Sequence, residues 1–313
     1  MGIVFACPRV FFRMFFPILK QQEIQTMCLK KLAVFNLVGL LLAATMSAAL
    51  AAVPETVPVG NPENKSDATG YGAVGYAYKI GKYEVTNAEY CEFLNAVAKN
   101  DTRDLYDGRM AEQYGGIDRS GNAGKYVYTV KSGMAKKPVG YVTWETCARY
   151  TNWLNNGPSS TETETGGYDF KSGSLKLPNH AELAKASTVK WALPTENEWY
   201  KAAYFDPSKS GGAGYWQYPG KGYTAPAANL SSDTPSEAGS FTKAVTAFGT
   251  FDQGGNQWEY NEASFDGKVG LRGGSWYIND NEGYMDAATR YDVLSAKWPN
   301  YGFRVVALGE AAK

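Results

Sequence analysis

The sequence predicts a single large α+β domain with short elements and many turns. Its 313 residues include 34 Gly together with 22 Tyr, 14 Phe and 8 Trp. This composition favours turns fixed by aromatic side chains over long helices. Three blocks of glycine and aromatic residues fall between Gly254 and Arg304. Glycine there allows tight turns and close backbone approach, so we expect this stretch to form short strands around an aromatic centre.

The first 51 residues are expected to be a leader that directs export. Residues 30–31 are lysines, residues 32–44 are apolar except for one Asn, and residues 49–51 match a small-x-small cleavage site. The apolar run is short for a membrane span, so an uncleaved anchor ranks second. Met27 begins an ordinary signal peptide by itself and is the expected true start. We therefore expect a periplasmic or extracellular protein without a stable membrane anchor.

The charge balance excludes one class of partner. Acidic and basic side chains number 31 each, so the formal net charge is zero. A nucleic-acid binder needs a basic footprint, and none is expected here. The same balance argues against polybasic attachment to anionic lipid.

The first elements after the leader are a linker, a strand and a helix. Residues 52–70 are rich in Pro, Gly, Asn and Ser and are expected to be the linker. Alternation predicts a strand over residues 76–85. Thr86 and Glu89 then form a capping box. The helix behind it carries an apolar stripe made of Tyr90, Phe93, Leu94 and Val97.

The middle of the domain is expected to contain one strand and a second helix. Residues 126–130 form the clear strand of a turn-rich region. Thr143 is the expected N-cap of a helix that runs to about Asn155, and Gly157 suits its C-terminal cap. The polar stretch over residues 157–174 is expected to be a surface insertion.

Two further helices are expected before the glycine-rich C-terminal part. Asn179 and Glu182 predict a short helix, and Thr195 with Glu198 predicts a better one through a second capping box. The domain is expected to span residues 71–308, followed by a short tail over 309–313.

The two cysteines of the mature chain admit two readings of equal weight. Cys91 and Cys147 form an even pair in an exported protein and could make a disulfide. Alternatively, they are two small buried residues on separate helices. The sequence alone does not place the two helix faces together, so both readings stay open.

Six blocks, in order, resemble the formylglycine-generating enzyme family, also called sulfatase-modifying factor domains. They cover roughly residues 76–307, and their ordered set is more specific than any single block. The resemblance implies an irregular C-type-lectin-like fold of the formylglycine-generating type. The blocks are residues 82–90, Pro138–Trp144, Leu193–Trp199, Gly255–Glu259, Arg272–Trp276 and Gly302–Arg304.

The resemblance also exposes a departure at the family's catalytic thiols. Family members use copper held by two cysteines that follow the Gly-Gly-Ser-aromatic block. Here residues 277–291 contain no Cys; Ile278 stands at the first position and Gly283 near the second. Copper(I) prefers thiolate ligands, so copper is not expected. Other relatives hold iron with histidines, whereas His180 is the single His of this chain and is read as a polar residue of a short helix.

A structural calcium site is the metal site that the resemblance implies. The matching positions are Asp252, Gly255, Gln257 and Glu259. Asp252 and Glu259 would supply carboxylates, and the other two would supply main-chain carbonyls, a donor set that suits Ca²⁺. The alternative is a plain turn in which Glu259 caps backbone amides.

Four residues are expected to contact a partner along the C-terminal loop. Trp276, Tyr277, Tyr284 and Arg290 correspond to, or follow, positions that line the family's substrate groove. Trp is also common in protein cores, and that reading is preferred for Trp258. Arg272, Arg290 and Arg304 resemble structural arginines, with buried stems and guanidinium groups that satisfy loop carbonyls, and binding an anionic partner is the less favoured alternative.

These observations favour an exported sulfatase-modifying factor domain without formylglycine-generating activity. Its groove would bind a peptide, glycan or protein partner through the C-terminal loop. The alternative is an oxidoreductase of the same family with an altered metal site or substrate, so whether the chain is an enzyme stays open. A purely structural surface-layer protein is the third and weakest reading.

Overall fold

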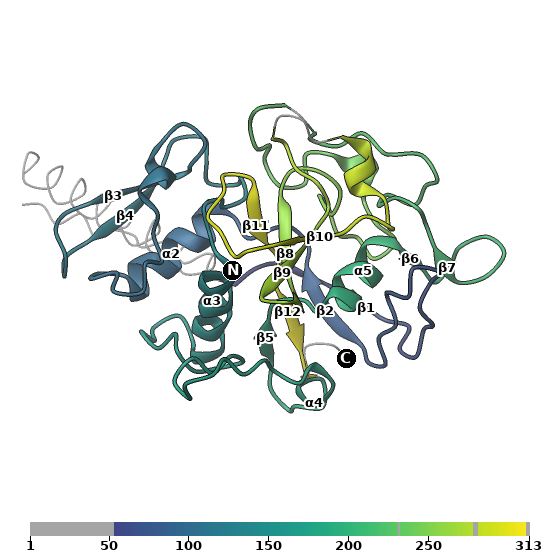
Figure 1. The fold of residues 1–313 in the computed structure, drawn as a ribbon, viewed down its shortest axis with the longest axis horizontal. Coiled ribbons are helices and arrows are strands. Elements are labelled where there is room, and N and C mark those ends of the chain that lie inside the picture. Colours follow the sequence, from purple (N-terminus) through teal and green to yellow (C-terminus); the bar gives the residue numbers. More distant parts are fainter. Residues whose placement is uncertain (1–52, 231, 278–280, 311–313) are drawn as a thin grey trace, which may run out of the picture. The chain divides into compact units, whose positions relative to one another are not determined.

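The computed structural model describes residues 53–230, 232–277 and 281–310, and its helices and strands are short. The leader expected over residues 1–51 lies outside this part of the chain. In chain order the elements are β1 Thr56–Val59, β2 Tyr78–Gly81, α2 Asn87–Val97, η1 Gly108–Ala111, β3 Ile117–Ser120, β4 Val127–Val130, α3 Trp144–Asn156, α4 His180–Leu183, β5 Lys190–Ala192, α5 Glu196–Tyr204, β6 Phe205–Asp206, β7 Gly214–Tyr215, η2 Thr242–Ala244, β8 Trp258–Phe265, β9 Lys268–Arg272, η3 Glu282–Met285, β10 Tyr291–Val293, β11 Tyr301–Phe303 and β12 Val306–Leu308. The architecture is the expected α+β type with modest regular structure (Figure 1).

One four-stranded sheet joins the start, middle and end of the domain. Its order is β1-β2-β12-β5, and every neighbouring pair is antiparallel. Val306 of β12 lies opposite both Ile80 and Ala192. All three β12 residues are buried, as expected of a central strand that is covered on both faces.

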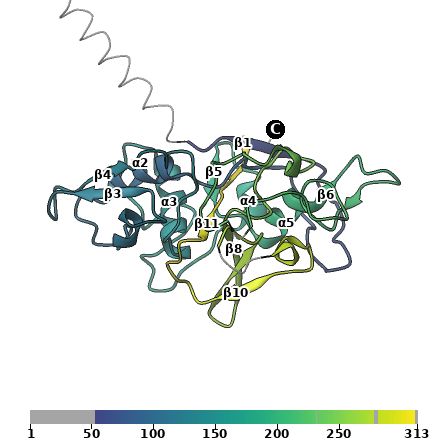
Figure 2. The same cartoon turned by 90° about the horizontal axis from the view of Figure 1, so that it is seen from above.

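A second sheet is built from the glycine and aromatic blocks. Its order is β10-β9-β8-β11, with β8 and β11 parallel and Tyr301 opposite Trp258. The β8–β9 ladder is interrupted between Tyr260 and Ser264. Helices α2 and α3 and the β3–β4 hairpin lie on one side of the two sheets, while α5 and β6–β7 lie on the other (Figures 1 and 2).

The helix starts follow the capping signals of the sequence. The Thr86–Glu89 and Thr195–Glu198 capping boxes are both formed, so these two predictions are confirmed. Thr143 caps α3 as expected, and Gly157 at its C-cap has φ 88°. The helix expected from Asn179 is a single turn, because α4 ends at Leu183. Among the described residues, no helix is long and apolar enough to cross a bilayer.

The linker prediction for residues 52–70 is wrong in part. Residues 56–59 form β1, which pairs with β2 along its whole length. Val59 is fully buried, although the Pro and Gly around it suggested a linker. Proline has no N–H to donate to a neighbouring strand, and an edge strand tolerates it where the N–H side faces solvent. Pro58 in the edge strand β1 is therefore compatible with the pairing.

Aromatic residues from both helices fill the core beside the sheets. Phe93 of α2 packs against Tyr150 and Trp153 of α3, with ring centroids 5.4 and 5.5 Å apart. Tyr150 also contacts Phe303 of β11 edge to face. Within this core Cys91 and Cys147 are both buried and free, so the disulfide reading does not hold.

A buried ion pair connects the two sheets. The Arg304 guanidinium donates to both Glu259 oxygens at 2.6 Å, and both side chains are 0% exposed. The same guanidinium donates to the carbonyls of Gly81 and Phe251, both at 2.9 Å. Trp199 of α5 adds an indole N–H bond to Glu259 at 2.6 Å. The structural role expected of Arg304 is confirmed, since its donors satisfy loop carbonyls.

The first prediction concerns this ion pair. Removing one partner leaves the other charged and buried, so Arg304→Met should lower the free energy of unfolding by roughly 3–5 kcal/mol. The double variant with Glu259→Met should recover part of that loss, because no charge is then left unpaired. Lys82→Gln breaks an exposed pair with Glu55 and should cost about 1 kcal/mol or less. Urea unfolding measures all three; equal losses for Arg304→Met and Lys82→Gln would contradict the assignment.

Candidate functional site

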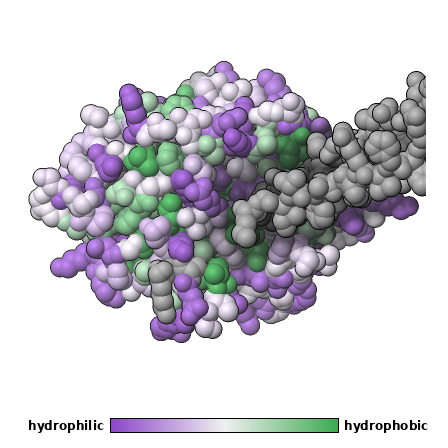
Figure 3. All heavy atoms as spheres, turned by 180° about the vertical axis from the view of Figure 1, so that it is seen from behind, coloured by the Kyte–Doolittle hydropathy of each residue, from purple (hydrophilic) through white to green (hydrophobic). Residues whose placement is uncertain are grey.

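The segment over residues 291–298, which comprises β10 and the chain that leads towards β11, presents large apolar side chains to solvent. Leu294 is 69% exposed, Trp298 is 51% exposed and Tyr291 is 43% exposed. On the face shown in Figure 3, hydrophobic residues lie in small groups among hydrophilic ones. Single exposed apolar residues are ordinary, but several within eight consecutive positions mark a candidate interaction site.

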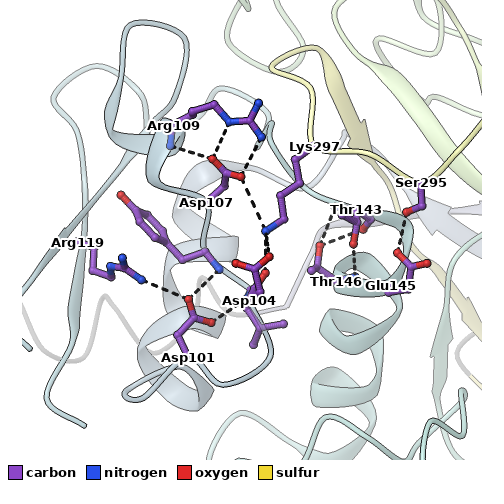
Figure 4. A network of polar contacts seen from close by, with 12 residues as sticks. Asp101, Asp104, Asp107, Arg109, Arg119, Thr143, Glu145, Thr146, Ser295 and Lys297 are labelled. Atoms are coloured by element: carbon purple, nitrogen blue, oxygen red, sulfur yellow. Dashed lines mark hydrogen bonds and ion pairs between the residues drawn. The ribbon is translucent and has the colours of Figure 1, made fainter. Parts of the chain in front are cut away.

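Polar contacts hold the backbone of this segment (Figure 4). Ser295 donates its hydroxyl to Glu145 at 2.7 Å and accepts the Trp144 N–H at 3.0 Å, which fixes it to the N-terminus of α3. Lys297 donates to both the carbonyl and the carboxylate of Asp104, at 3.0 and 2.5 Å. The segment is therefore tied to α3 and to the loop before η1.

Two backbone carbonyls of this segment are also held by hydrogen bonds. The Trp298 carbonyl accepts the N–H of Tyr141 at 2.8 Å. The Ala296 carbonyl accepts the hydroxyl of Tyr260 at 2.7 Å. Because polar groups anchor Ser295 to Trp298, the side chains of Leu294 and Trp298 are displayed on a fixed backbone. Such preorganisation lowers the entropic cost of binding.

An aromatic group lies next to this segment. The rings of Trp258, Tyr284 and Tyr291 contact one another, with centroid separations between 5.1 and 5.5 Å. Trp258 is 5% exposed, whereas Tyr284 is half-buried and Tyr291 is exposed. Trp258 thus belongs to the core, as expected, and supports two tyrosines that reach the surface.

The partner prediction for Trp276 is corrected. Its indole is 0% exposed, donates to the Gln257 side chain at 3.1 Å and packs against Tyr114. Buried by these contacts, the side chain offers no surface to a partner. Tyr277 is half-buried beside it. Ile278, where the family's first thiol is expected, lies outside the described residues.

Arg290 is bound within the chain. Its guanidinium donates to Glu196 at 2.9 Å and pairs with Asp292 at 2.9 Å, and its side chain is 20% exposed. Arg272 shares Glu196 and donates to the carbonyls of Ala287 and Thr289. The structural role expected of Arg272 is confirmed. The two arginines fix the loop before β10 to the first turn of α5.

In the expected calcium turn, the carboxylate of Glu259 is bound by Arg304. Both Glu259 oxygens accept from Arg304, and one of them also accepts from Trp199. Glu259 therefore does not fit the ligand role that the resemblance implies. Asp252 and the carbonyls of Gly255 and Gln257 are the three expected ligands that remain, and with a single carboxylate among them we do not expect this turn to hold Ca²⁺ stably. Across the described residues, no three His, Cys, Asp or Glu side chains are grouped to hold a metal ion.

The remaining carboxylate of this turn lies in a crowded acidic environment. Asp252 is 2% exposed and accepts the N–H of Gly239 at 2.6 Å. Burial raises its pKa to about 6, against the lowering effects of that bond and of Arg304. Burial also raises the pKa of Glu84 well above its usual range, helped by Asp252 and Glu259. The positive charge of Arg304 thus pairs with Glu259 and lowers the pKa values of Asp252 and Glu84.

His180 lies in the first turn of the short helix α4, as expected, but it is also enclosed by two carboxylates. It is 4% exposed, with Nδ1 2.9 Å from Glu198 and Nε2 3.2 Å from Glu262. Burial alone would lower the pKa of His180, but the two carboxylates outweigh it and raise the pKa to about 10. No spacing in the sequence links these three residues, because Glu262 lies on a strand far along the chain. Tyr168 donates to Glu262 on its other side.

The thiols of Cys91 and Cys147 are unreactive because they are buried. Burial raises the pKa of Cys91 to about 11 and that of Cys147 well above its usual range. Thiolate is the form that binds metal and attacks electrophiles. Neither cysteine can therefore replace the thiols that residues 277–291 lack.

Comparison with known proteins agrees with this architecture. The sequence model of the family described as "Sulfatase-modifying factor enzyme 1-like domain" matches residues 56–308. No curated protein is significantly similar to the chain in sequence.

Several solved structures match the chain at low sequence identity and with TM-scores below 0.5. "Treponema denticola variable protein 1" is 17% identical, with 80% of this chain and 94% of that chain covered and a TM-score of 0.43. CarF is 20% identical, with 82% and 98% covered and a TM-score of 0.47. PvdO from Pseudomonas aeruginosa is 19% identical, with 82% and 92% covered and a TM-score of 0.43. These similarities say nothing of activity.

The second prediction concerns calcium. Because Arg304 already neutralises Glu259, chelation with EGTA should leave the thermal midpoint unchanged. Differential scanning calorimetry with and without added Ca²⁺ measures it. The expectation would be contradicted if the thermal midpoint of the wild type fell on chelation and returned with added Ca²⁺, while that of Asp252→Asn did not respond. That result would restore the calcium site.

The third prediction concerns pH. The pKa of His180 is raised from an unfolded value near 6.5 to about 10. Its stabilisation should therefore be complete below about pH 6.5 and be lost as the pH rises through 10. The wild type should exceed His180→Gln in free energy of unfolding at pH 6, and the difference should shrink towards pH 10. Comparing the two proteins cancels the titration of groups that do not contact His180. Burial raises the pKa of Glu198, but pairing with His180 outweighs this and lowers it, so that carboxylate titrates below the range from pH 6 to 10. A difference that does not change with pH would refute the charged state.

Proposed function

The chain belongs to the sulfatase-modifying factor enzyme 1-like domain family, and from that premise we propose that it is an exported binding domain without formylglycine-generating activity. Its partner is a polypeptide, which it holds on the segment over residues 291–298. Export rests on the leader pattern of residues 1–51.

The absence of thiol chemistry is supported by the sequence and by burial together. Residues 277–291 contain no Cys, and the chain has no other cysteine outside the leader than Cys91 and Cys147. Both are buried with raised pKa values. Copper(I) has no soft ligand pair in this set.

The observation that carries the binding proposal is the exposure of Leu294 and Trp298 on an anchored backbone. Exposing a large apolar side chain forgoes stabilisation of about 1.5–3 kcal/mol that burial would give. Tryptophan in particular is enriched among residues that dominate interface energies. Four anchoring contacts keep these side chains on the surface rather than letting the loop fold over them.

The chemistry of the segment favours a polypeptide over a glycan. A glycan-binding surface combines flat aromatic faces with polar groups that are free to bond hydroxyls. Here Leu294 is the most exposed large apolar residue, and Ser295 and Lys297 are already bound within the chain. An aliphatic side chain beside an indole suits the apolar side chains of a peptide or protein.

The fourth prediction tests this surface. A displayed peptide library selected on the immobilised protein should yield ligands that bind the wild type. Leu294→Ser and Trp298→Ala should each weaken them at least tenfold, in line with the roughly 2 kcal/mol of a hot-spot residue. The control is Val127→Ser, which alters an equally exposed apolar residue on β4 and should bind like wild type. Ligands insensitive to both changes, or enrichment on a glycan array alone, would sink the proposal.

The oxidoreductase alternative makes an opposite prediction. It requires that the protein oxidise a cysteine-containing peptide in a copper-dependent reaction. Mass spectrometry of the peptide after incubation measures this. The binding proposal expects the cysteine to be recovered unchanged. Conversion that depends on stoichiometric bound metal would overturn it.

A further inference from the structure

A cavity lies at the start of α3, and two of its lining residues, Trp144 and Glu145, are hydrogen-bonded to Ser295 of the exposed segment. Its volume is about 240 Å³, and it opens between the start of α3, the stretch before α4 and the β8–β9 hairpin. The residues that matter for its chemistry are Trp144, Glu145, Leu175, Leu177, Glu262 and Val269. Neither the family match nor the proposed function assigns it a role.

The apolar walls of the cavity are unusually open. Leu175 is 44% exposed and Leu177 is 46% exposed. They face a cavity that also contains the Trp144 ring and Val269. A ligand with an apolar stem would remove this surface from water, with a gain of about 25 cal/mol per Å².

The acidic end of the cavity carries uncompensated charge. Glu262 shares the His180 imidazolium with Glu198, so one positive group stands between two carboxylates. Glu145 at the rim is bound to the neutral hydroxyl of Ser295. Among the described lining residues there is no basic side chain. The ligand that complements this end is a cation.

The geometry distinguishes between two kinds of cation. One Glu262 oxygen accepts from Tyr168 and one Glu145 oxygen accepts from Ser295. The other Glu262 oxygen lies 3.2 Å from Nε2 of His180, so within the described part of the chain Glu145 alone of the two carboxylates keeps an oxygen without a partner, and neither offers two. A guanidinium prefers both oxygens of one carboxylate, whereas an ammonium directs three independent donors.

We propose that this cavity binds a lysine side chain presented by a polypeptide. The four-carbon stem lies against Leu175, Leu177 and Trp144, and the ammonium bonds Glu145, with the negative charge of Glu262 adding attraction at longer range. A long aliphatic stem with a charged tip is the form that such a mixed site accommodates. Ser295 of the segment over residues 291–298 positions Glu145, but the lysine does not contact Leu294 or Trp298, so the proposal does not depend on the polypeptide partner proposed for that segment.

The test is a calorimetric titration of the full chain with N-acetyl-lysine methylamide. The uncharged control ligand is N-acetyl-norleucine methylamide, which has the same stem, and the arginine compound is the third arm. Glu145→Gln keeps an acceptor for Ser295 and removes one charge, so it should weaken the lysine compound about fivefold. Leu177→Ser should also weaken it, while Glu112→Gln, an exposed acid outside the lining, should not.

Each outcome decides the proposal once thermal unfolding shows that the variants are folded. Binding of the lysine compound that is stronger than that of both other compounds and weakened by Glu145→Gln supports it. Equal binding of the norleucine compound, tighter binding of the arginine compound, an unaffected Glu145→Gln, or no heat at saturating concentrations overturns it.

Discussion

A guanidinium and a carboxylate that are both removed from water determine how this domain is assembled. Arg304 follows β11 and Glu259 lies on β8, so their pair closes the second sheet where its two parallel strands meet. The remaining donors of Arg304 bond carbonyls at the end of β2 and before β8. Desolvating two charges is costly, and only such complete satisfaction makes the pair compatible with folding. Glycine-rich turns around it are then fixed without long helices.

This constraint also shapes the surface that we propose for binding. Residues 291–298 comprise β10 and most of the connection to β11, and both strands belong to the sheet that the ion pair closes. The segment is anchored at its ends by strands and in its middle by Ser295 and Lys297. A rigid frame therefore supports side chains that have no place in the core. The sheet that the ion pair closes therefore both stabilises the domain and keeps the apolar side chains of residues 291–298 exposed.

Local signals in the sequence predicted local structure well. The capping boxes at Thr86 and Thr195 depend on residues three positions apart, and both formed. Contacts between distant residues escaped prediction. Nothing near His180 indicates that Glu198 and Glu262 will enclose it, because pairing across the fold sets that contact.

The family pattern predicted the scaffold better than the site. It correctly indicated structural roles for Arg272 and Arg304. It placed Glu259 on a metal, although the same pattern supplies the arginine that takes both of its oxygens. It also suggested Trp276 for partner contact, where burial decides otherwise. Leu294 and Trp298 lie outside the six blocks, so only their exposure in the structure marks them.

The most direct measurement of the central claim is amide hydrogen exchange with a selected peptide ligand bound. The account predicts slowed exchange over residues 291–298 and around Tyr284, with little change in α2 and in the β3–β4 hairpin. Protection confined to other parts of the domain, with residues 291–298 exchanging as in the free protein, would contradict it.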